Sequence, residues 1–415
     1  MTARGFATFG KHDDNTLDEM GEVMLDARYG ALMADAHKGY SMPIGGVAAY
    51  RDQVNVAGVG VDIACGNCAM RTVINLEDLG EHKAWMRNLG LWIQQNIEFG
   101  MKGQVNRSSR APRDYELFDD PAWELVPQEH RSQLIAKARN QLGTVGGGNH
   151  YVDLLVDEAG YLWVGVHFGS RRFGYDVSNA YVSIAQGGAW GEKGDWNQSS
   201  LLDLGTPVGD DYWELMQLAG RYAYAGRDWV CREIIRWMES CPVDIVHNNH
   251  NFAWQERHYG ENLIVVRKGA TPAFPGQRGF VGGSMGDDAV ILQGVAVPEE
   301  SEDTATPAYQ RRALFSTVHG AGRVRSRTAT RGKVKKGKIV RPGLVSLEEA
   351  RDWVKRRDVF VFGGDIDESP QAYRRLDEVL AHQGITIDIL HTLTPRVVVM
   401  APGYSGANPF LTEVA

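Results

Sequence analysis

The chain has few cysteines and no long apolar run, and each shortage excludes a class of protein. Four cysteines among 415 residues are too few and too unevenly placed for a disulfide-stapled secreted domain. No segment approaches the roughly 20 apolar residues that a membrane-spanning helix needs, and the first residues lack the apolar stretch of a signal peptide. We therefore expect a cytoplasmic protein that has no membrane partner.

Linkers and internal repeats are missing as well. No Ser- or Pro-rich segment divides the chain, and no period of 20–50 residues recurs. An apolar fraction of 43% with 23% charged residues is ordinary for a globular protein that buries a core. Because the candidate site residues run from Asp62 to His319, two independent domains would separate them. We predict a single interleaved domain over residues 1–415.

The charge balance has one local exception. A net charge of −8 argues against a general nucleic-acid-binding protein, yet residues 323–341 carry nine Lys or Arg and no Asp or Glu. Such a stretch is either a solvated loop or a contact for a polyanion backbone. Because it begins inside a glycine-rich turn, we favour a contact with substrate phosphate.

The spacing of apolar residues predicts an α+β fold with mixed sheets. Helices are expected at residues 17–27, 76–97, 131–141, 211–240 and 370–383, with Gly220 and Gly226 as candidate breaks in the longest one. Strands are expected at residues 54–63, 69–74, 151–156, 161–166, 243–246, 263–267, 290–297, 359–362, 385–390 and 396–400. Long helices without regular βαβ alternation are typical of this class.

Three histidines lie in turns rich in glycine or asparagine, at residues 146–150, 167–171 and 319–323. Glycine lets the backbone approach a bound group closely and adopt positive φ, so that a neighbouring His or Arg faces a cavity. Together with residues 62–65 and 250–251, these turns predict one metal and phosphate centre. The chain is therefore expected to be an enzyme.

Two of these histidines belong to a predicted hairpin. The apolar runs 151–156 and 161–166 flank a turn at residues 157–160. An even-length loop would place His150 directly opposite His167, where Cβ atoms lie about 5 Å apart. The two imidazoles could then share one metal ion or hold two adjacent ones.

Other candidate ligands follow predicted strands. Asp62 and Cys65 come at the end of an expected strand over residues 56–63, and carboxylate, thiolate and imidazole together suit zinc, manganese or iron. His250 follows the strand 243–246, with His247 and Asn248 as competitors for its role. The remaining cysteines, which lack the second pair that a zinc knuckle needs, are expected to be buried small apolar residues: Cys68, Cys231 and Cys241.

His319 has different surroundings. Residues 320–323 offer backbone N–H groups and a guanidinium, which suit phosphate oxygens. His319 is therefore either a covalent phosphoryl or nucleotidyl acceptor or a further metal ligand. Residues 267–271 and 282–286 add candidate contacts for a phosphate or a base.

In combination, the motifs resemble the RtcB family of RNA-splicing ligases. They are collinear from about residue 30 to residue 400 and lie at residues 34–37, 60–66, 143–150, 167–171, 250–251, 267–271, 283–286, 319–323 and 368–373. The Gly-Gly-Gly-Asn-His and His-Gly-Ala-Gly-Arg motifs are highly specific together. The resemblance implies a central metal cleft between the sheets.

The resemblance also implies a GTP- and Mn²⁺-dependent ligase. His319 would form a His–GMP adduct, with support from Asp35 and Arg171, and GMP would pass to an RNA 3′-phosphate that arises from a 2′,3′-cyclic phosphate. A 5′-hydroxyl would then displace GMP and seal the strand. Two Mn²⁺ ions would be held by Asp62, a shared Cys65, His150, His167 and His250; the ligand types leave zinc open as an alternative to manganese. The implied nucleotide contacts are Asn149, Tyr151, Asp153, Asn251, Gly282, Gly283, Ser284, Met285, Gly320, Ala321, Gly322 and Tyr373.

Partners follow from the same resemblance. The substrate would be RNA with broken ends, such as tRNA, and an archease-like protein would be a candidate activator. The chain departs from the family pattern where it has Tyr151, Asp153, residues 287–289 (Asp-Asp-Ala) and Met400. Two other functions stay open: a metal-dependent phosphoesterase that acts on RNA ends without a covalent nucleotide, and a non-catalytic module that binds RNA ends.

Overall fold

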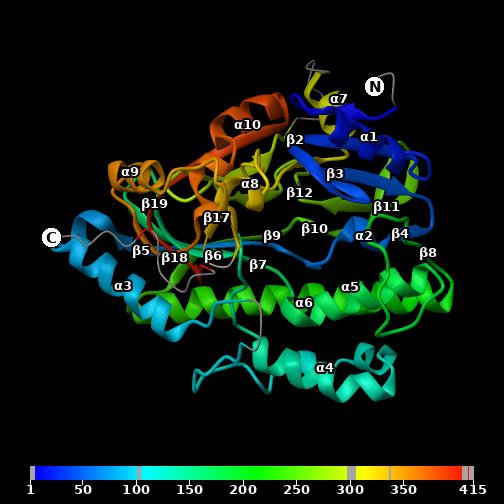
Figure 1. Ribbon diagram of the computed structural model, residues 1–415, viewed down its shortest axis with the longest axis horizontal. Helices are drawn as coiled ribbons and strands as arrows, with labels where there is room; N and C mark the ends of the chain where they lie inside the picture. Colours follow the sequence, from blue (N-terminus) through cyan, green and yellow to red (C-terminus); the bar gives the residue numbers. More distant parts are fainter. Residues whose placement is uncertain (1–4, 101–103, 297–304, 336–337, 404–409, 411–415) are drawn as a thin grey trace.

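The strands form two large sheets and three two-stranded ribbons within the part of the chain described by the computed structural model, residues 5–100, 104–296, 305–335, 338–403 and 410 (Figure 1). The larger sheet holds β5 (Gly66–Asn75), β6 (Tyr151–Val156), β7 (Tyr161–Phe168), β9 (Pro242–Asn249), β13 (Arg278–Val281), β14 (Ala289–Gly294), β18 (Phe360–Gly364) and β19 (Ile387–Pro402). The smaller sheet holds β1 (Ala7–Thr8), β2 (Tyr29–Tyr40), β3 (Met42–Tyr50), β10 (Asn251–His258) and β11 (Glu261–Lys268). The ribbons pair β4 (Gln53–Asn55) with β8 (Leu201–Asp203), β12 (Ala270–Pro272) with β15 (Ser316–Val318), and β16 (Gly332–Lys335) with β17 (Lys338–Pro342). This mixed architecture confirms the predicted fold class.

Most helices lie around these sheets, whereas the short α2 is buried between β11 and α5 (Figure 1). They are α1 (Asp14–Val23), α2 (Val56–Val59), α3 (His82–Asn96), α4 (Gln128–Gln141), α5 (Arg171–Ala185), α6 (Pro207–Trp237), α7 (Ala305–Arg312), α8 (Arg327–Arg331), α9 (Leu347–Arg356) and α10 (Leu376–Gln383). Short 3-10 turns lie at Leu76–Asp78, Glu116–Asp119, Pro121–Leu125, Ile366–Glu368, Pro370–Ala372 and Gly384–Thr386. None of the described helices has both the length and the apolar character that a membrane crossing requires.

The larger sheet curls until its two edge strands meet. Its order is β13-β14-β19-β6-β7-β5-β9, with β18 beside β19. Asn248 on β9 accepts a hydrogen bond from the Phe280 amide of β13 at 2.9 Å, and Asn67 donates to the Phe280 carbonyl at 2.8 Å. These side chains satisfy backbone groups that an open edge would leave unpaired, and the sheet therefore approaches a barrel.

The longest helix, α6, runs below the strands in Figure 1 and is continuous over 31 residues. The predicted breaks at Gly220 and Gly226 are wrong, because both glycines serve close packing instead. A Cβ atom on Gly226 would lie 3.3 Å from the Phe168 ring, and one on Gly220 would lie 3.0 Å from the Phe252 ring. The glycines therefore let α6 lie directly against the strands that carry the candidate site.

Most predicted elements are confirmed, and the exceptions have local causes. The expected strand 54–63 is confirmed only at its first two residues, which lie in β4, and is wrong from Val56 on. Asn55 caps α2 by accepting from the Gly58 amide at 2.9 Å, and Gly60 ends that helix at a φ of 96°. The expected strands 385–390 and 396–400 are one strand, β19, with a register shift after Pro395. The helices expected at 76–97 and 370–383 each begin with a 3-10 turn, and Val297 lies outside the described residues.

Candidate functional site

Three strands of the larger sheet bring three candidate ligands to one end. Gly66, the first residue of β5, pairs with Phe168 at the end of β7 on one side and with Asn249 at the end of β9 on the other. Cys65 therefore lies beside both His167 and His250. The His250 amide also donates to the Cys65 carbonyl at 2.9 Å, which joins the two ligand-bearing turns directly.

The β6–β7 hairpin supplies a fourth ligand in a register that differs by one from the prediction. Tyr151, not His150, pairs with His167, because the loop has three residues and Gly160 takes the left-handed position at a φ of 87°. His150 precedes the strand, so the strand pleat does not fix its direction. Its ring still lies 5.3 Å from that of His167, while Tyr151 stacks on His167 at 5.5 Å.

The five predicted metal ligands gather in one cluster. Cys65 Sγ lies 3.5 Å from His150 Nε2 and 3.7 Å from His167 Nε2, and one ligand atom of each lies within 4.8 Å of the others. Asp62, in the turn after α2, places Oδ2 3.2 Å from His150 Nε2. The His250 and His167 rings are 5.1 Å apart.

The cluster fits a metal ion because several of its polar atoms have no other partner. His250 Nδ1 is buried and makes no hydrogen bond to any described residue, and His150 Nε2 faces Cys65 and Asp62, two other members of the cluster. His167 Nδ1 instead lies 2.7 Å from Asn67 Oδ1, which orients the ring so that Nε2 faces Cys65. Nitrogen, carboxylate and thiolate donors together suit manganese or zinc.

Burial sets the protonation of the cluster. It lowers the pKa of His167 and of His250 well below the usual range, and the neighbouring histidines add to the effect, so both rings keep a lone pair at neutral pH. Burial would raise the pKa of Asp62, but the hydrogen bond and charge of His150 outweigh it. Burial and Asp62 raise the pKa of Cys65 well above its usual value, so a cation favours its thiolate.

His319 follows β15 and sits beside a buried carboxylate. Its Nδ1 lies 2.6 Å from Asp35 Oδ2, and the same oxygen accepts from the amides of His319 and Gly320 at 3.2 and 3.3 Å. Gly322 is required here, because its φ is 72° and a Cβ atom would lie 2.4 Å from the Asp35 carbonyl oxygen. The His319 ring is 5.1 Å from that of His250.

A cavity of about 320 Å³ adjoins His319 and the metal-ligand cluster. It is lined by most of the predicted nucleotide contacts, namely Asn149, Tyr151, Asp153, Gly282, Gly283, Ser284, Met285, Gly320, Ala321, Gly322 and Tyr373. Two predicted site residues do not line this cavity. Asn251 accepts from the Gly269 amide at 2.7 Å, and Arg171 donates to Thr144 at 3.2 Å and to the Gly100 carbonyl at 2.7 Å.

One wall of this cavity comes from β6 and β19. Tyr151 pairs with Met400 and Asp153 with Val398, so a polar and an apolar side chain alternate on the wall. The Tyr151 hydroxyl and Asp153 Oδ1 are buried without a hydrogen bond to any described residue. Burial also raises the pKa of Asp153 well above its usual value. Both atoms are therefore available to a polar ligand.

Residues 287–289 are one of the places where the chain departs from the family pattern. Their acidic residue Asp287 does not line the cavity. Asp287 accepts from the Ser284 hydroxyl at 2.6 Å and pairs with Arg375 at 2.6 Å. Its charge is thus neutralised by a neighbour.

The predicted burial of Cys68 and Cys231 is confirmed, whereas the prediction is wrong for Cys241, which is exposed just beyond α6.

Sequence reasoning gave no role to several residues that line the cavity. His37 follows the buried Asp35, and burial lowers its pKa to about 4. Glu368 pairs with Arg323 at 3.0 Å, and it also contacts Arg327 and the Tyr373 hydroxyl. The sequence features that could have pointed to these residues are the Asp-x-His pattern at residues 35–37 and the acidic turn that contains Glu368.

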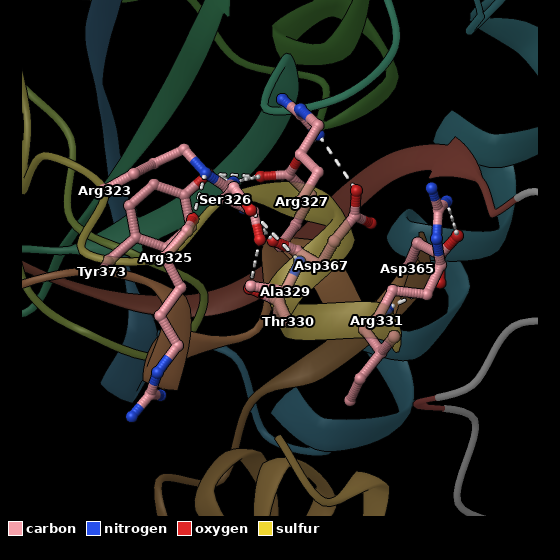
Figure 2. Close-up of polar contacts among 12 residues, drawn as sticks. Arg323, Arg325, Ser326, Arg327, Ala329, Thr330, Arg331, Asp365, Asp367 and Tyr373 are labelled. Atoms are coloured by element: carbon pink, nitrogen blue, oxygen red, sulfur yellow. Dashed lines mark hydrogen bonds and ion pairs between the residues drawn. The ribbon is translucent and has the colours of Figure 1, made fainter. Parts of the chain in front are cut away.

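The basic stretch is held by acidic partners over its first half. Figure 2 shows Arg327 facing Asp367 and Arg331 facing Asp365, at 3.4 and 3.6 Å. Arg323 donates to the Asp367 carbonyl at 2.7 Å. These contacts order the segment along the rim of the cavity. Residues 336–337 of the stretch lie outside the described residues.

The two competitors of His250 have structural partners. His247 Nε2 accepts from Arg227 Nε at 2.7 Å. Asn248 accepts from the Phe280 amide at 2.9 Å. Neither joins the cluster, and His250 is the residue that does.

Comparison with known proteins shows the family of the chain. A family model described as tRNA-splicing ligase RtcB matches residues 22–401. The chain belongs to the RtcB family. It is 31% identical to the RNA-splicing ligase RtcB of Escherichia coli (strain K12) over 394 residues, 89% of each chain. It is 28% identical to the tRNA-splicing ligases RtcB of Pyrobaculum aerophilum, over 86% of this chain and 84% of the relative, and of Thermococcus kodakarensis, over 93% and 91%.

Proposed function

We propose that this RtcB-family protein is an RNA ligase. It joins RNA 3′-phosphate or 2′,3′-cyclic phosphate ends to 5′-hydroxyl ends, consumes GTP and requires Mn²⁺. The observation that carries the proposal is His319, held by buried Asp35 at 2.6 Å and lining a cavity next to an unsatisfied metal-ligand cluster. The family relatives named as RNA- and tRNA-splicing ligases support the substrate class.

The first chemical step is nucleotidyl transfer to His319. Asp35 beside Nδ1 favours the tautomer with its proton on Nδ1, so that the Nε2 lone pair is free to attack. Nε2 forms a bond to the α-phosphorus of GTP, and the bond to pyrophosphate breaks. A metal ion held by Asp62, Cys65, His150, His167 and His250 would neutralise phosphate charge and orient the leaving group.

Two transfers follow on the RNA. An oxygen of the RNA 3′-phosphate attacks the GMP phosphorus and breaks its bond to His319. The 5′-hydroxyl of the second strand then attacks the activated 3′-phosphate, and GMP leaves. The amides of Ala321 and Gly322, two residues that line the cavity, would be candidate donors to phosphate oxygens.

The cavity supports a nucleotide as the ligand that activates His319. Tyr151 and Tyr373 offer aromatic surfaces to a base, and Asp153 offers a polar atom to a base edge. Asn149 and residues 282–285 line the same cavity. The basic stretch at its rim would contact the RNA backbone. An archease-like activator stays a prediction.

Labelling with nucleotide tests the proposal. Protein incubated with Mn²⁺ and α-labelled GTP is expected to retain label, while γ-labelled GTP leaves none. His319→Ala should remain unlabelled, and Asp35→Asn should label at least about tenfold more slowly because the imidazole loses its anchor. His391→Gln, a surface histidine paired with Glu158, is the matched control and should label normally.

The same assay separates the alternatives. Retained label in His319→Ala, or no label with GTP or ATP while the metal is bound, would contradict the proposal. Hydrolysis of a 2′,3′-cyclic end without GTP and without His319 would identify a phosphoesterase. Salt-dependent RNA binding without turnover would identify a binding module.

A further inference from the structure

One fully buried arginine donates hydrogen bonds to the segments that carry the metal-ligand cluster. Arg227 lies on α6 with a relative exposure of 0%. Its four hydrogen-bond acceptors are two backbone carbonyls, an amide oxygen and an imidazole nitrogen, all uncharged. Burying a charge that is not hydrogen-bonded to an opposite charge is costly, so this guanidinium needs an explanation beyond packing.

The acceptors of Arg227 lie next to three of the proposed metal ligands. Nη1 donates to the Ala64 carbonyl at 2.8 Å and to the Phe168 carbonyl at 2.6 Å. Nη2 donates to Asn249 Oδ1 at 2.6 Å. Ala64 precedes Cys65, Phe168 follows His167, and Asn249 precedes His250. One planar fork thus bridges three ligand-bearing segments.

The backbone next to Cys65 is held in an unusual conformation. Ala64 has a φ of 57° although it is not a glycine, a conformation that persists only where the surroundings enforce it. The hydrogen bond from Arg227 fixes the direction of the Ala64 carbonyl, and the Ala64 amide donates to the Asn251 carbonyl at 2.7 Å. The Cys65 side chain is therefore aimed by contacts on both sides of the Ala64 residue.

Gly226, the residue before Arg227 on α6, lets the arginine approach the metal-ligand cluster. Gly226 allows α6 to approach the Phe168 ring, where a Cβ atom would lie 3.3 Å away. Arg227 Nε then donates to His247 Nε2 at 2.7 Å, and the Tyr224 ring stacks on that imidazole at 3.8 Å. These contacts fix the orientation of the guanidinium.

We propose that Arg227 is a positioning residue for the metal centre, which clamps the Cys65, His167 and His250 segments in the register that metal binding needs. The inference rests on the metal site of the proposed function. A lysine cannot replace the fork, because one ammonium on a flexible stem lacks the fixed geometry of a guanidinium. Partners that orient metal ligands typically change metal affinity by about 10- to 100-fold when they are removed.

The test measures Co²⁺ binding by the full-length protein. Co²⁺ alone is the probe, because a thiolate ligand gives it a near-ultraviolet charge-transfer band, and its affinity is measured by competition with a chelator. Arg227→Met and Arg227→Lys are both expected to weaken Co²⁺ binding by about 10- to 100-fold and to reduce the band. Unfolding by urea is measured in parallel.

Two variants of the same helix serve as controls. Ile234→Ala removes buried packing and should lower stability without changing Co²⁺ affinity or the band. Arg232→Met removes a surface pair with Asp228 and should change neither. If Arg227→Met does not fold, Asn249→Ala, which removes one acceptor, should still weaken binding by several-fold.

The outcomes separate this inference from the proposed function. A wild-type protein that binds no Co²⁺ would overturn both. Wild-type affinity and an unchanged band in the Arg227 variants, or in Asn249→Ala where those do not fold, would overturn the role of Arg227 and leave the metal site standing. Weakened binding in Ile234→Ala to the same degree would also overturn it, because any loss of stability would then suffice.

Discussion

Two buried polar clusters that contain histidine differ in how completely their polar atoms are paired. In the first, His258 Nε2 lies 2.7 Å from a carboxylate oxygen of Glu256, and both oxygens of Glu256 accept from Arg267, at 2.7 and 3.0 Å. In the second, His250 Nδ1 has no partner among the described residues, and His150 Nε2 approaches Cys65 and Asp62 of the same cluster at 3.5 and 3.2 Å. Both clusters are buried and both contain imidazoles and carboxylates, so burial and composition do not separate them.

The difference indicates which cluster needs an outside partner. Buried polar groups in native proteins are hydrogen-bonded, and the Glu256 cluster satisfies that rule with its own side chains. Its arginine also donates to Ser316 and to the Leu314 carbonyl at 2.8 and 2.9 Å, which ties the smaller sheet to β15. The cluster around Cys65 leaves donor atoms converging on one point. We interpret the first as architecture and the second as a binding centre.

The largest expected effect comes from breaking the second cluster. Cys65→Ala removes the sulfur that approaches both His150 and His167, and it should weaken metal binding about a thousandfold, on the order of 4 kcal/mol. The free energy of unfolding of the metal-free protein should change by only about 1 kcal/mol. Isothermal titration with Mn²⁺ and urea unfolding measure the two quantities. Intact metal binding would mean that the cluster is structural.

Breaking the Glu256 cluster should lower the stability of the protein and leave its metal affinity unchanged. Glu256→Gln leaves Arg267 buried without its counter-charge, and such a change costs about 3 to 5 kcal/mol of stability. Metal affinity should stay at the wild-type value, because none of these side chains belongs to the metal-ligand cluster. Urea unfolding and the same titration check this expectation. A loss of metal affinity without a loss of stability would reverse the two assignments.

A smaller effect is expected from pH. Burial would raise the pKa of Glu256, but Arg267 and His258 outweigh it and leave the pKa below its usual value. The stabilisation by this carboxylate is therefore complete above its unfolded pKa of about 4.3 and is lost as pH falls through the lower folded pKa. The stability difference between wild type and Glu256→Gln should be constant from pH 8 to pH 5 and narrow below about pH 4.3. A gap that widens in acid would contradict the pairing.

The sequence predicted the members of the binding centre better than their geometry. Glycine-rich turns beside His150, His167 and His319 marked residues that the structure brings together, because such turns constrain the local backbone strongly. The hairpin register was off by one, since a loop of two or four residues and one of three residues ending at Gly160 fit the same apolar pattern. The turn at Asp62 was taken for a strand, because the capping role of Asn55 depends on local geometry that apolar spacing does not show.

Roles that depend on distant backbone atoms were beyond the sequence. Arg227 contacts the carbonyls of Ala64 and Phe168, and no sequence pattern shows where a carbonyl points. Glu368 and Arg323 meet only because the chain returns to the cavity after β18. The single interleaved domain and the cytoplasmic location stay predictions.

The most direct test of the binding centre is anomalous diffraction from crystals grown with Mn²⁺. The predicted result is a manganese peak within coordination distance of Cys65 Sγ, His150 Nε2 and His167 Nε2, with no peak at His258. Crystals of a protein that retains the fold but shows no peak at Cys65, with its imidazole nitrogens hydrogen-bonded to one another or to water, would contradict the account.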